Sequence, residues 1–504
     1  MSHEIGIASA EMVPFAKVGG LADVVGALSK ELDRLGQKVT VFLPRYPEIN
    51  ERRFPGLKVE KVGEADIQLG SRLERAQFGR ATVPGTGVRL ILIGHDRFFH
   101  RPNPYVDPAT GVDWPDNAER FVFFSKAVIE SWRDLQWMPE VLHANDYQTG
   151  LIPALLREGY SHDPRYADVA TLYSVHNMGY QGIFPTDPAG DARPVLDLIG
   201  LPPALARPTG PLEFWGRVNF MKAAIHYADL INTVSERYAE EIQSAEEFGF
   251  GLEGVLRERG RDVFGILNGI DSEVWDPATD KLLPFNYTAK DLTGKKENKI
   301  RLLESMELPV EPEVPLIGII SRLVDQKGFD LIEQIAGDLF SARLKVVVLG
   351  NGQPKYEELM RKLREKHPTK LGVALQFNDQ LAHLIEAGSD FFLMPSKYEP
   401  CGLNQMYSLR YGTVPIVRAT GGLADTVQDY EFETGKGNGF VFEEYAPEAL
   451  LATVRRALTL YQKKRPWKKL VTEIMKLDHS WGSAARKYVA AYERALERRA
   501  VGVR

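Results

Sequence analysis

The sequence has very little of what builds disulfide-linked, membrane-spanning or polyanion-binding proteins. Cys401 is the only cysteine in 504 residues, so no disulfide can form within the chain and a reducing compartment is expected. The longest apolar runs, such as KVVVL and PLIGII, are far shorter than the roughly 20 residues that span a bilayer. The N-terminal segment has no signal-peptide or transit-peptide character, and the net charge of −6 does not indicate a nucleic-acid-binding protein, which is usually basic. We therefore expect a cytoplasmic protein that binds neither membranes nor nucleic acids.

Three nucleotide-binding signatures are also missing. No GxGxxG follows a predicted strand, because the nearest candidate, LGNGQPKYEE, lacks the third glycine. The chain contains no GxxxxGK[ST], and no two aspartates are separated by a single residue. These absences argue against a dinucleotide cofactor, a P-loop and an aspartate-held metal diphosphate site, so we expect no cofactor and no metal.

Short β-branched segments recur along the chain, each followed by glycine or polar residues and then by a helical pattern. This alternation is typical of βαβ units around a parallel sheet. About a dozen such segments are too many for one ordinary sheet, and 504 residues exceed what one core usually organises. We therefore predict an α/β protein with two doubly wound parallel sheets. The segments are EIGIASA, KVTVFLP, VRLILIG, EVLHAND, ATLYSVHN and DLINTVS, then VFGILNG, PLIGIIS, LKVVVLG, VALQFN, DFFLMPS and TVPIVRAT.

The strand signals restart near Arg261, so we predict domains over residues 1–261 and 262–480, followed by a C-terminal helix over 481–504. Trp481, Tyr488, Tyr492 and Leu496 lie on one face of that helix. The apolar face packs either on the second domain or, by crossing back, on the first. The long stretches 50–87 and 98–121 are candidate substrate-contacting insertions.

The pentapeptide GGLAD occurs twice, each time between a predicted strand and a predicted helix. The first copy includes Gly19, Gly20 and Asp23 and is preceded by Lys17, whereas the second begins at Gly421 after Thr420. Glycines at such a junction let the backbone approach a ligand, and a helix N-terminus presents N–H groups to an anion. The alternative for the first copy is a simple glycine turn with Asp23 favouring the helix dipole.

Polar side chains end two neighbouring strand segments of the first half. His143 and Asp146 end EVLHAND, and His176 and Asn177 end ATLYSVHN. Ligands of open α/β sheets bind beyond the carboxyl ends of the strands. We interpret His143 as a buried, hydrogen-bonded histidine and His176 as the better candidate for the site, because a glycine-bearing loop follows it.

The second half carries a candidate anion site. Arg322 and Lys327 lie on one predicted strand-to-helix loop, where two cations beside a helix N-terminus are unfavourable unless an anion binds between them. The alternative is a pair of solvated charges. Glu399 and Pro400 precede the next predicted helix, with Pro400 in its first turn, and glutamate is not a favoured N-cap. We infer that Glu399 serves a ligand, whereas Cys401 fills space rather than acting as a nucleophile.

Several longer motifs resemble those of the bacterial glycogen synthases and plant starch synthases. They are KVGGLADVVGALSKEL, WPDNAERF, HANDYQTG, VHNMGYQGIF, LNGID, SRLVDQKG, EPCGLNQMYSLRYG and TGGLADTV. This resemblance implies a retaining glucosyltransferase of the GT-B fold, with two Rossmann-like domains facing across a deep cleft. It also implies ADP-glucose as donor and an α-1,4-glucan such as glycogen as acceptor, with the acceptor on the first domain and the donor on the second.

The resemblance also implies roles for individual residues. The charged groups of catalysis are Lys17, Arg322 and Lys327 at the leaving diphosphate, with His176 and Glu399 near the transferred glucose. Glu399 is expected to position the sugar, and a nucleophilic role is the less favoured alternative. The expected substrate-binding positions are Lys17, Gly19, Gly20, Asp23, Asp146, Asn177, Asn268, Phe377, Cys401, Gly402, Leu403, Asn404, Thr420, Gly421 and Gly422.

A few positions depart from the family pattern. Tyr147 stands where tryptophan is common, Phe377 replaces a tyrosine that stacks on adenine, and Asn404 replaces a threonine. None of these changes removes a charged group of the expected site. The competing interpretations are the same fold with UDP-glucose as donor, a phosphorylase, and a catalytically silent glucan-binding protein. The oligomeric state is not evident from the sequence.

Overall fold

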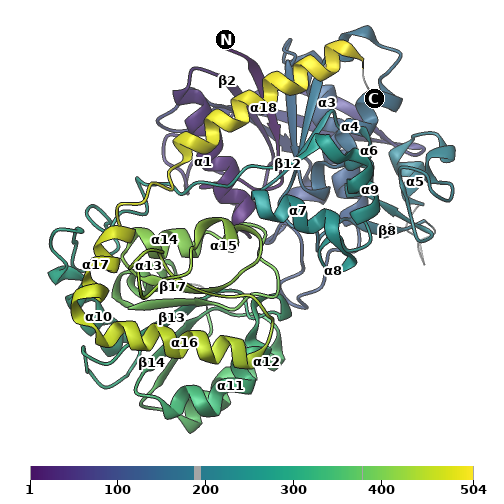
Figure 1. Ribbon diagram of the computed structural model, residues 1–504. Coiled ribbons are helices and arrows are strands. Elements are labelled where there is room, and N and C mark those ends of the chain that lie inside the picture. Colours follow the sequence, from purple (N-terminus) through teal and green to yellow (C-terminus); the bar gives the residue numbers. More distant parts are fainter. Residues whose placement is uncertain (1, 187–193, 377, 503–504) are drawn as a thin grey trace. The chain divides into compact units, whose positions relative to one another are not determined.

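The computed structural model describes residues 2–186, 194–376 and 378–502, which form two compact units. Unit 1 consists of Met1–Val234, Ala239–Ile266 and Trp481–Arg504, and unit 2 consists of Ser235–Tyr238 and Leu267–Ser480. The chain therefore begins and ends in unit 1, as the purple and yellow segments of Figure 1 show. The second unit is inserted between the strands of unit 1 and its last helix.

The main sheet of unit 1 has nine strands in the order β12-β11-β7-β6-β1-β2-β5-β4-β3. The strands from β12 to β5 pair in parallel, and their mostly buried residues match a sheet covered on both faces. The strands are β1 (Glu4–Ala8), β2 (Lys38–Pro44), β3 (Glu60–Leu69), β4 (Arg72–Thr82), β5 (Arg89–Gly94), β6 (Val141–Asn145), β7 (Ala170–Val175), β11 (Leu230–Thr233) and β12 (Val263–Gly265). A small second sheet contains β8 (Ile183–Pro185), β10 (Arg217–Asn219) and β9 (Glu213–Phe214).

The helices of the first part of the chain connect these strands. They are α1 (Gly20–Arg34), α2 (Asp96–Phe99), α3 (Asn117–Asp134), α4 (Leu151–Ala154), α5 (Val195–Ile199), α6 (Phe220–Tyr227), α7 (Glu236–Ser244), α8 (Glu246–Gly249) and α9 (Glu253–Arg259). The long stretch predicted as an insertion over 50–87 contains the antiparallel hairpin β3–β4 at the sheet edge. Strand β3 alternates exposed and buried residues because an edge hairpin buries only one face.

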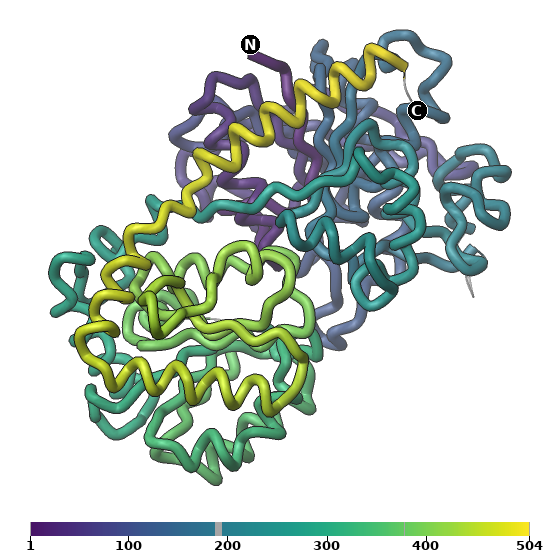
Figure 2. The backbone as a smooth tube through the Cα atoms, viewed as in Figure 1, coloured from purple at the N-terminus to yellow at the C-terminus, as the bar shows by residue number. Residues whose placement is uncertain are grey.

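The C-terminal helix α18 (Trp481–Val501) packs on unit 1, beside α1 and across β6 and β7, which confirms the crossing-back alternative. Its path next to α1 can be followed in Figure 2. Tyr492 and Tyr488 are fully buried and reach polar groups in the strands below. The Tyr492 hydroxyl lies 3.0 Å from Nδ1 of His143, and the Tyr488 hydroxyl accepts a 3.2 Å bond from Asn232. His143 is thus the buried, hydrogen-bonded histidine that the sequence predicted.

Unit 2 contains a six-stranded, fully parallel sheet in the order β15-β14-β13-β16-β17-β18, so both predicted sheets are confirmed. Its strands are β13 (Leu316–Ile320), β14 (Lys345–Leu349), β15 (Leu371–Ala374), β16 (Phe391–Met394), β17 (Val414–Arg418) and β18 (Phe440–Phe442). Its helices are α10 (Thr293–Ser305), α11 (Phe329–Ser341), α12 (Pro354–Lys366), α13 (Asp379–Gly388), α14 (Asn404–Arg410), α15 (Gly421–Thr426), α16 (Pro447–Gln462) and α17 (Lys464–Ile474).

Two predictions about element positions are wrong. The segment VFGILNG was expected to begin the second sheet, but β12 pairs with β11 and belongs to unit 1, which continues to Ile266 rather than ending at residue 261. Pro400 was expected in the first turn of a helix, yet α14 begins at Asn404. Residues 399–403 form a loop instead, so Glu399 is not an N-cap and the argument from capping preference does not apply to it.

Unit 2 also contains a buried carboxyl group, that of Glu386, which forms no ion pair within the part of the chain that the structure describes. Glu386 of α13 is fully buried and accepts a 2.6 Å bond from Ser408, while its Oε1 has no partner among the described residues. Burial raises the pKa of Glu386 from 4.5 to about 8. Between pH 4.5 and about 8, Glu386 therefore holds a proton in the folded state that it has released in the unfolded chain.

Because this folded pKa is raised, the stability contributed by protonated Glu386 is lost as the pH rises from about 4.5 through about 8. Glu386→Gln, which stays neutral, should raise the free energy of unfolding at pH 9 by about 2 kcal/mol and change it little at pH 5. Denaturant unfolding at both pH values measures this difference. The control is Glu358→Gln on α12, an exposed carboxylate; an equal pH dependence in the two variants would contradict the prediction.

Candidate active site

Five loops of unit 1 leave from one edge of its sheet. Strands β1, β2, β5, β6 and β7 run parallel, so the loops that follow their carboxyl ends gather on one side. Lys17 follows β1, Asp146 follows β6, and His176 and Asn177 follow β7. The residues predicted from strand ends in this half of the chain thus share one edge of the sheet.

Asp146 and His176 are in direct contact. The His176 backbone N–H donates to Oδ1 of Asp146 over 2.8 Å, and its ring Nε2 lies 2.9 Å from Oδ1 of Asn145. The Asn145 amide donates from its Nδ2 to the carbonyls of Ala8 and His143, which fixes Oδ1 as the acceptor toward the ring. We therefore assign the Nε2–H tautomer to His176.

Burial gives both residues unusual charge states. It lowers the pKa of His176 to about 3, so the imidazole is neutral near pH 7. It raises the pKa of Asp146 to about 7, and the nearby Glu11 carboxylate adds to this rise. Asp146 also adopts a positive φ of 52°, a conformation that a non-glycine residue reaches only at a cost. Strain and burial of this kind are common at functional sites.

The loop that carries Lys17 leads into α1. The Lys17 ammonium pairs with Asp23 in the first turn of that helix over 2.8 Å, and the Lys17 side chain is 46% exposed. Glycine at position 19 is not required by space, because a Cβ there would have no heavy atom within 4 Å. The N–H groups of Val18 and Gly19, which directly precede the first residue of α1, both donate to Glu11.

Sequence reasoning missed Glu11 and Tyr105. Glu11 is buried, with 3% of its surface exposed, and its Oε1 accepts a 2.6 Å bond from the Tyr105 hydroxyl. The signal for Glu11 was available, because the residue directly follows the predicted strand EIGIASA. Tyr105 lies in the stretch 98–121, where the sequence predicts an insertion but singles out no residue.

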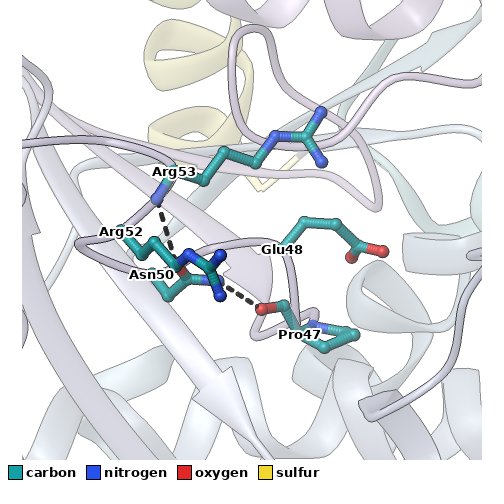
Figure 3. A pocket seen from close by; sticks show the side chains of 5 residues that line it. All are labelled: Pro47, Glu48, Asn50, Arg52 and Arg53. Atoms are coloured by element: carbon teal, nitrogen blue, oxygen red, sulfur yellow. Dashed lines mark hydrogen bonds between the residues drawn. The ribbon is translucent and has the colours of Figure 1, made fainter.

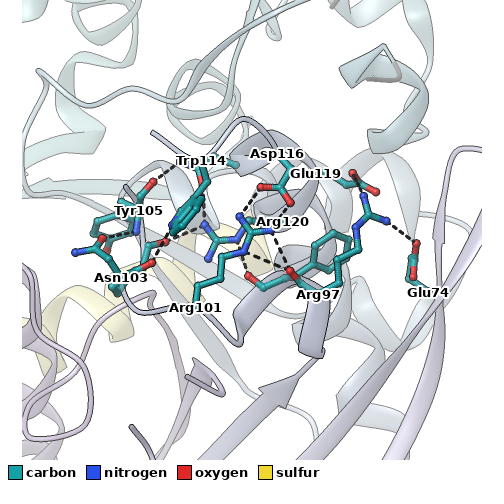
Figure 4. A network of polar contacts seen from close by, with 12 residues as sticks. Glu74, Arg97, Arg101, Asn103, Tyr105, Trp114, Asp116, Glu119 and Arg120 are labelled. Atoms are coloured by element: carbon teal, nitrogen blue, oxygen red, sulfur yellow. Dashed lines mark hydrogen bonds and ion pairs between the residues drawn. The ribbon is translucent and has the colours of Figure 1, made fainter. Parts of the chain in front are cut away.

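The loop around Tyr105 is held by a polar network, drawn in Figure 4. Arg101 forms an ion pair with Asp116, and the Trp114 indole N–H donates to the Asn103 carbonyl over 3.0 Å. Arg120, at the start of α3, is fully buried and donates to the carbonyls of Phe98 and Pro104 and to the Asn117 side chain. These bonds fix a loop that has little regular secondary structure.

A small cavity lies in the loop after β2. Its volume is about 410 Å³, and its lining residues, shown in Figure 3, are Pro47, Glu48, Asn50, Arg52 and Arg53. Asn50 braces the loop by donating to the Pro47 carbonyl over 2.7 Å and accepting from the Arg53 N–H over 3.0 Å. The Glu48 and Arg53 side chains supply hydrogen-bonding groups of both kinds.

In unit 2, the neighbouring strands β13, β16 and β17 bring together the loops that carry the predicted charged residues. The Lys327 ammonium lies 2.6 Å from Oε2 of Glu399, and this ion pair is largely buried, with side-chain exposures of 17% and 8%. Ser396 donates a second bond to the same oxygen over 2.9 Å. Arg322 is exposed on the loop that also carries Lys327. The structure thus joins Lys327 and Glu399 directly.

Backbone contacts lock these loops together. The Lys397 N–H donates to the Gln326 carbonyl over 2.8 Å, and the Gln326 side chain donates to the Tyr398 carbonyl over 3.1 Å. Gly328 has φ 74°, and a Cβ there would lie 2.0 Å from the Pro395 carbonyl oxygen. Lys327 and Glu399 are therefore positioned by paired loops that tolerate little displacement.

The second GGLAD copy also meets the Glu399 loop. A Cβ on Gly421 or Gly422 would lie 2.0 Å from the carbonyl oxygen of Glu399 or Cys401, respectively, and the Gly422 N–H is shared between the Glu399 and Pro400 carbonyls. Thr420 is the buried N-cap of α15. The glycines of this copy are thus explained by close packing of backbone on backbone.

The remaining predicted positions of unit 2 cluster around Cys401. Burial raises the pKa of the Cys401 thiol to about 12, so the thiol stays protonated, as expected for a packing residue. Asn268 lies against it, is 5% exposed, and its Oδ1 has no hydrogen-bond partner among the described residues. Gly402 has φ 69°, Leu403 is the N-cap of α14, and Asn404 donates to the Ile320 carbonyl over 2.8 Å. Phe377 lies outside the described residues.

Two classes of feature are absent from the part of the chain that the structure describes. Within residues 2–186, 194–376 and 378–502, no three His, Cys, Asp or Glu side chains gather into a group suited to a metal ion. None of the helices in those ranges is sufficiently long and apolar for a transmembrane segment.

Comparison with known proteins identifies relatives along the whole chain. Residues 4–258 match the family model described as starch synthase catalytic domain, and residues 304–474 match glycosyl transferases group 1. A glycogen synthase of Koribacter versatilis is 46% identical over 98% of this chain and 99% of its own length, and one of Pseudothermotoga lettingae is 45% identical over the same shares. The catalytic domain of starch synthase IV from Arabidopsis thaliana, solved with ADP and acarbose, superimposes with a TM-score of 0.89 at 33% identity, covering 99% of this chain and 100% of that one.

The two GGLAD copies should respond differently to the same substitution. Gly421→Ala should lower the free energy of unfolding by at least about 2 kcal/mol, since its Cβ meets a backbone oxygen at 2.0 Å and its φ is 43°. Gly19→Ala should change it by less than about 0.5 kcal/mol, because φ is −138° and the Cβ has open space. Denaturant unfolding of both variants tests this; equal losses would contradict the packing account.

Proposed function

Because the chain belongs to the starch and glycogen synthase family of glycosyltransferases, we propose that it transfers glucose from ADP-glucose to the non-reducing end of an α-1,4-glucan, with retention at the anomeric carbon. The observation that carries the proposal is the largely buried Lys327–Glu399 pair at the carboxyl ends of adjacent strands, with Arg322 on the same loop as Lys327. This arrangement supplies cations for a diphosphate and a carboxylate for a sugar on neighbouring loops. The proposal includes a cytoplasmic location, with glycogen as the acceptor.

Stabilisation of the leaving group is the main task of the cations. Breaking the bond between the anomeric carbon and the phosphate leaves negative charge on ADP, which preorganised cations stabilise more in the transition state than in the ground state. Lys327 has three N–H donors, so it can bind a phosphate oxygen and still keep Glu399. Arg322 adds a planar, two-pronged donor, and Lys17 is the further cation that the family resemblance implies for the donor.

The carboxylates act on the sugar rather than as nucleophiles in this proposal. Oε2 of Glu399 already accepts bonds from Lys327 and Ser396, which withdraw electron density from the carboxylate and make it a poor nucleophile. This supports sugar positioning by Glu399 and attack by the acceptor from the leaving-group side. The orphaned Oδ1 of buried Asn268 supports a similar role, because a substrate hydroxyl would satisfy it.

His176 contributes as a neutral group. Since its pKa is about 3, the ring is a neutral imidazole near pH 7 and not the imidazolium that would act as a general acid. Its Nε2–H is bonded to Asn145, and its backbone N–H is bonded to Asp146. The Asp146 carboxyl, which titrates near pH 7, is available to accept from or donate to a glucose hydroxyl.

The decisive experiment measures transfer of labelled glucose from ADP-glucose into glycogen, with UDP-glucose in a parallel reaction. Incorporation from ADP-glucose alone, or strongly preferred, supports the proposal. A preference for UDP-glucose would support the proposed glucosyl transfer but contradict ADP-glucose as the donor. Glycogen binding without incorporation from either donor would favour a catalytically silent glucan-binding protein instead.

Replacing either member of the buried pair should abolish transfer selectively. We expect Lys327→Ala and Glu399→Gln each to lower kcat by about 10²–10³-fold, the usual cost of losing a preorganised charge in the transition state. Glycogen affinity, followed by affinity electrophoresis, should remain close to that of the wild type. Lys355→Ala is the matched control, since Lys355 pairs with exposed Asp325 of the same loop. Undiminished activity in either pair variant would refute the assignment.

The cavity after β2 should serve the acceptor. Replacing Arg52 and Arg53 with alanine should raise KM for glycogen by roughly 3–10-fold, the cost of a few exposed hydrogen bonds, and leave KM for ADP-glucose unchanged. Arg80→Ala on β4 is the control, because that arginine is exposed and paired with Glu60. Initial rates at varied glycogen and varied ADP-glucose separate the two constants; a change confined to the donor constant would contradict this role.

A further inference from the structure

Glu11 holds the segment between Lys17 and the start of α1. Its Oε2 accepts from the Val18 N–H over 2.5 Å and from the Gly19 N–H over 2.8 Å. Gly19 is the N-cap of α1 and has no side chain of its own to cap the helix. Glu11 therefore caps this helix from outside, from a position eight residues earlier in the chain.

The rest of the loop is organised by its own backbone. The Ala16 N–H and the Met12 N–H each donate to the other residue's carbonyl over 2.9 Å, and the Val13 N–H donates to the Ala22 carbonyl over 3.0 Å. A Cβ on Gly26 of α1 would lie 2.4 Å from the Val13 side chain, so this part of the loop packs tightly on the helix. Residues 12–16 are thus fixed independently, whereas Val18 and Gly19 depend on Glu11.

Tyr105 fixes the orientation of the Glu11 carboxylate. Its hydroxyl donates to Oε1 over 2.6 Å, which leaves Oε2 facing the two backbone N–H groups. All three bonding partners of Glu11 are donors, which is the pattern that a carboxylate requires. Tyr105 is anchored in turn by Asn103 and Asn117, so the network of Figure 4 continues to the Lys17 loop.

We propose that Glu11 is a positioning residue for glucosyl transfer: with Tyr105, it fixes the backbone at Val18 and Gly19 and thereby sets where Lys17 presents its ammonium group to the donor phosphates. This inference rests on the proposed function for its chemical purpose. The Lys17 side chain is long and half-exposed, so the placement of its backbone controls where the ammonium can reach. Without Glu11, the two N–H groups would turn toward water or the substrate, and the loop would lose its fixed register.

The test compares Glu11→Ala, Glu11→Gln, Tyr105→Phe and the double variant Glu11→Ala/Tyr105→Phe with the wild type. The matched control is Glu31→Ala, a carboxylate at the other end of α1 that pairs with Arg34. Three quantities are measured: amide hydrogen exchange over residues 17–20, kcat/KM for ADP-glucose, and the activity restored by added formate. Formate fits because it can place a carboxylate in the space that Glu11→Ala vacates.

We expect Glu11→Ala to speed exchange of the Val18 and Gly19 amides at least about tenfold and to lower kcat/KM about 100-fold. Glu11→Gln, which keeps an acceptor oxygen, should lose less than about tenfold, and Tyr105→Phe a similar amount. The double variant should be no worse than Glu11→Ala, because both residues act through one contact. Formate should rescue Glu11→Ala but not Lys327→Ala, and the control Glu31→Ala should keep the wild-type exchange rates and kcat/KM.

Unchanged exchange at Val18 and Gly19, or kcat/KM within twofold of the wild type in Glu11→Ala, would overturn the inference. The inference would also be overturned if formate did not restore the activity of Glu11→Ala and Glu11→Gln were as inactive as Glu11→Ala. A purely structural defect behaves in that way. If Glu11→Ala fails to fold, Glu11→Gln and Tyr105→Phe decide the question by the same readouts. A wild-type protein inactive with ADP-glucose would instead overturn the proposed function, and hydrogen exchange would still decide whether Glu11 holds the loop.

Discussion

Parallel pairing of the strands is the constraint on which the candidate sites of both units depend. In a parallel sheet the carboxyl ends of all strands lie at the same edge, so loops that are distant in sequence become neighbours. In unit 2 this geometry joins Lys327, after β13, to Glu399, after β16, across 72 residues of sequence. In unit 1 it joins Asp146 to His176 in the same way. The glycines then decide how closely these loops approach each other.

Burial gives the two units different electrostatic characters. Unit 2 keeps its charges as a tight ion pair, in which each partner compensates for the loss of water around the other. At the ends of β6 and β7 in unit 1, by contrast, His176 is uncharged and Asp146 titrates near neutrality. The first arrangement suits the binding of a highly charged diphosphate. The second suits contacts with the uncharged hydroxyls of a sugar, which hydrogen-bond well to neutral donors and acceptors.

Much of the fold was predictable because runs of β-branched residues, and the glycines that follow them, can be recognised from a few consecutive residues. The same signals located Lys17, His176, Arg322 and Glu399 at the ends of strands. Pairing partners are not local, which is why β12 was assigned to the wrong sheet. The start of α14 was misplaced because a proline preference could not reveal the packing of residues 399–403 against α15. Charge states were beyond the sequence, since they depend on burial that only the folded chain creates.

The position of α18 in unit 1 also fixes the order in which the protein can be completed during synthesis. A ribosome delivers the chain from its N-terminus, and domains usually fold in that order. Here the strands of unit 1 emerge first, but Tyr488 and Tyr492, which fill its core and bond His143 and Asn232, emerge last. All of unit 2 is therefore synthesised before α18, the helix that covers part of the apolar face of unit 1. A released chain that ends before Trp481 would contain all of unit 2 but would leave uncovered the face of unit 1 on which α18 packs.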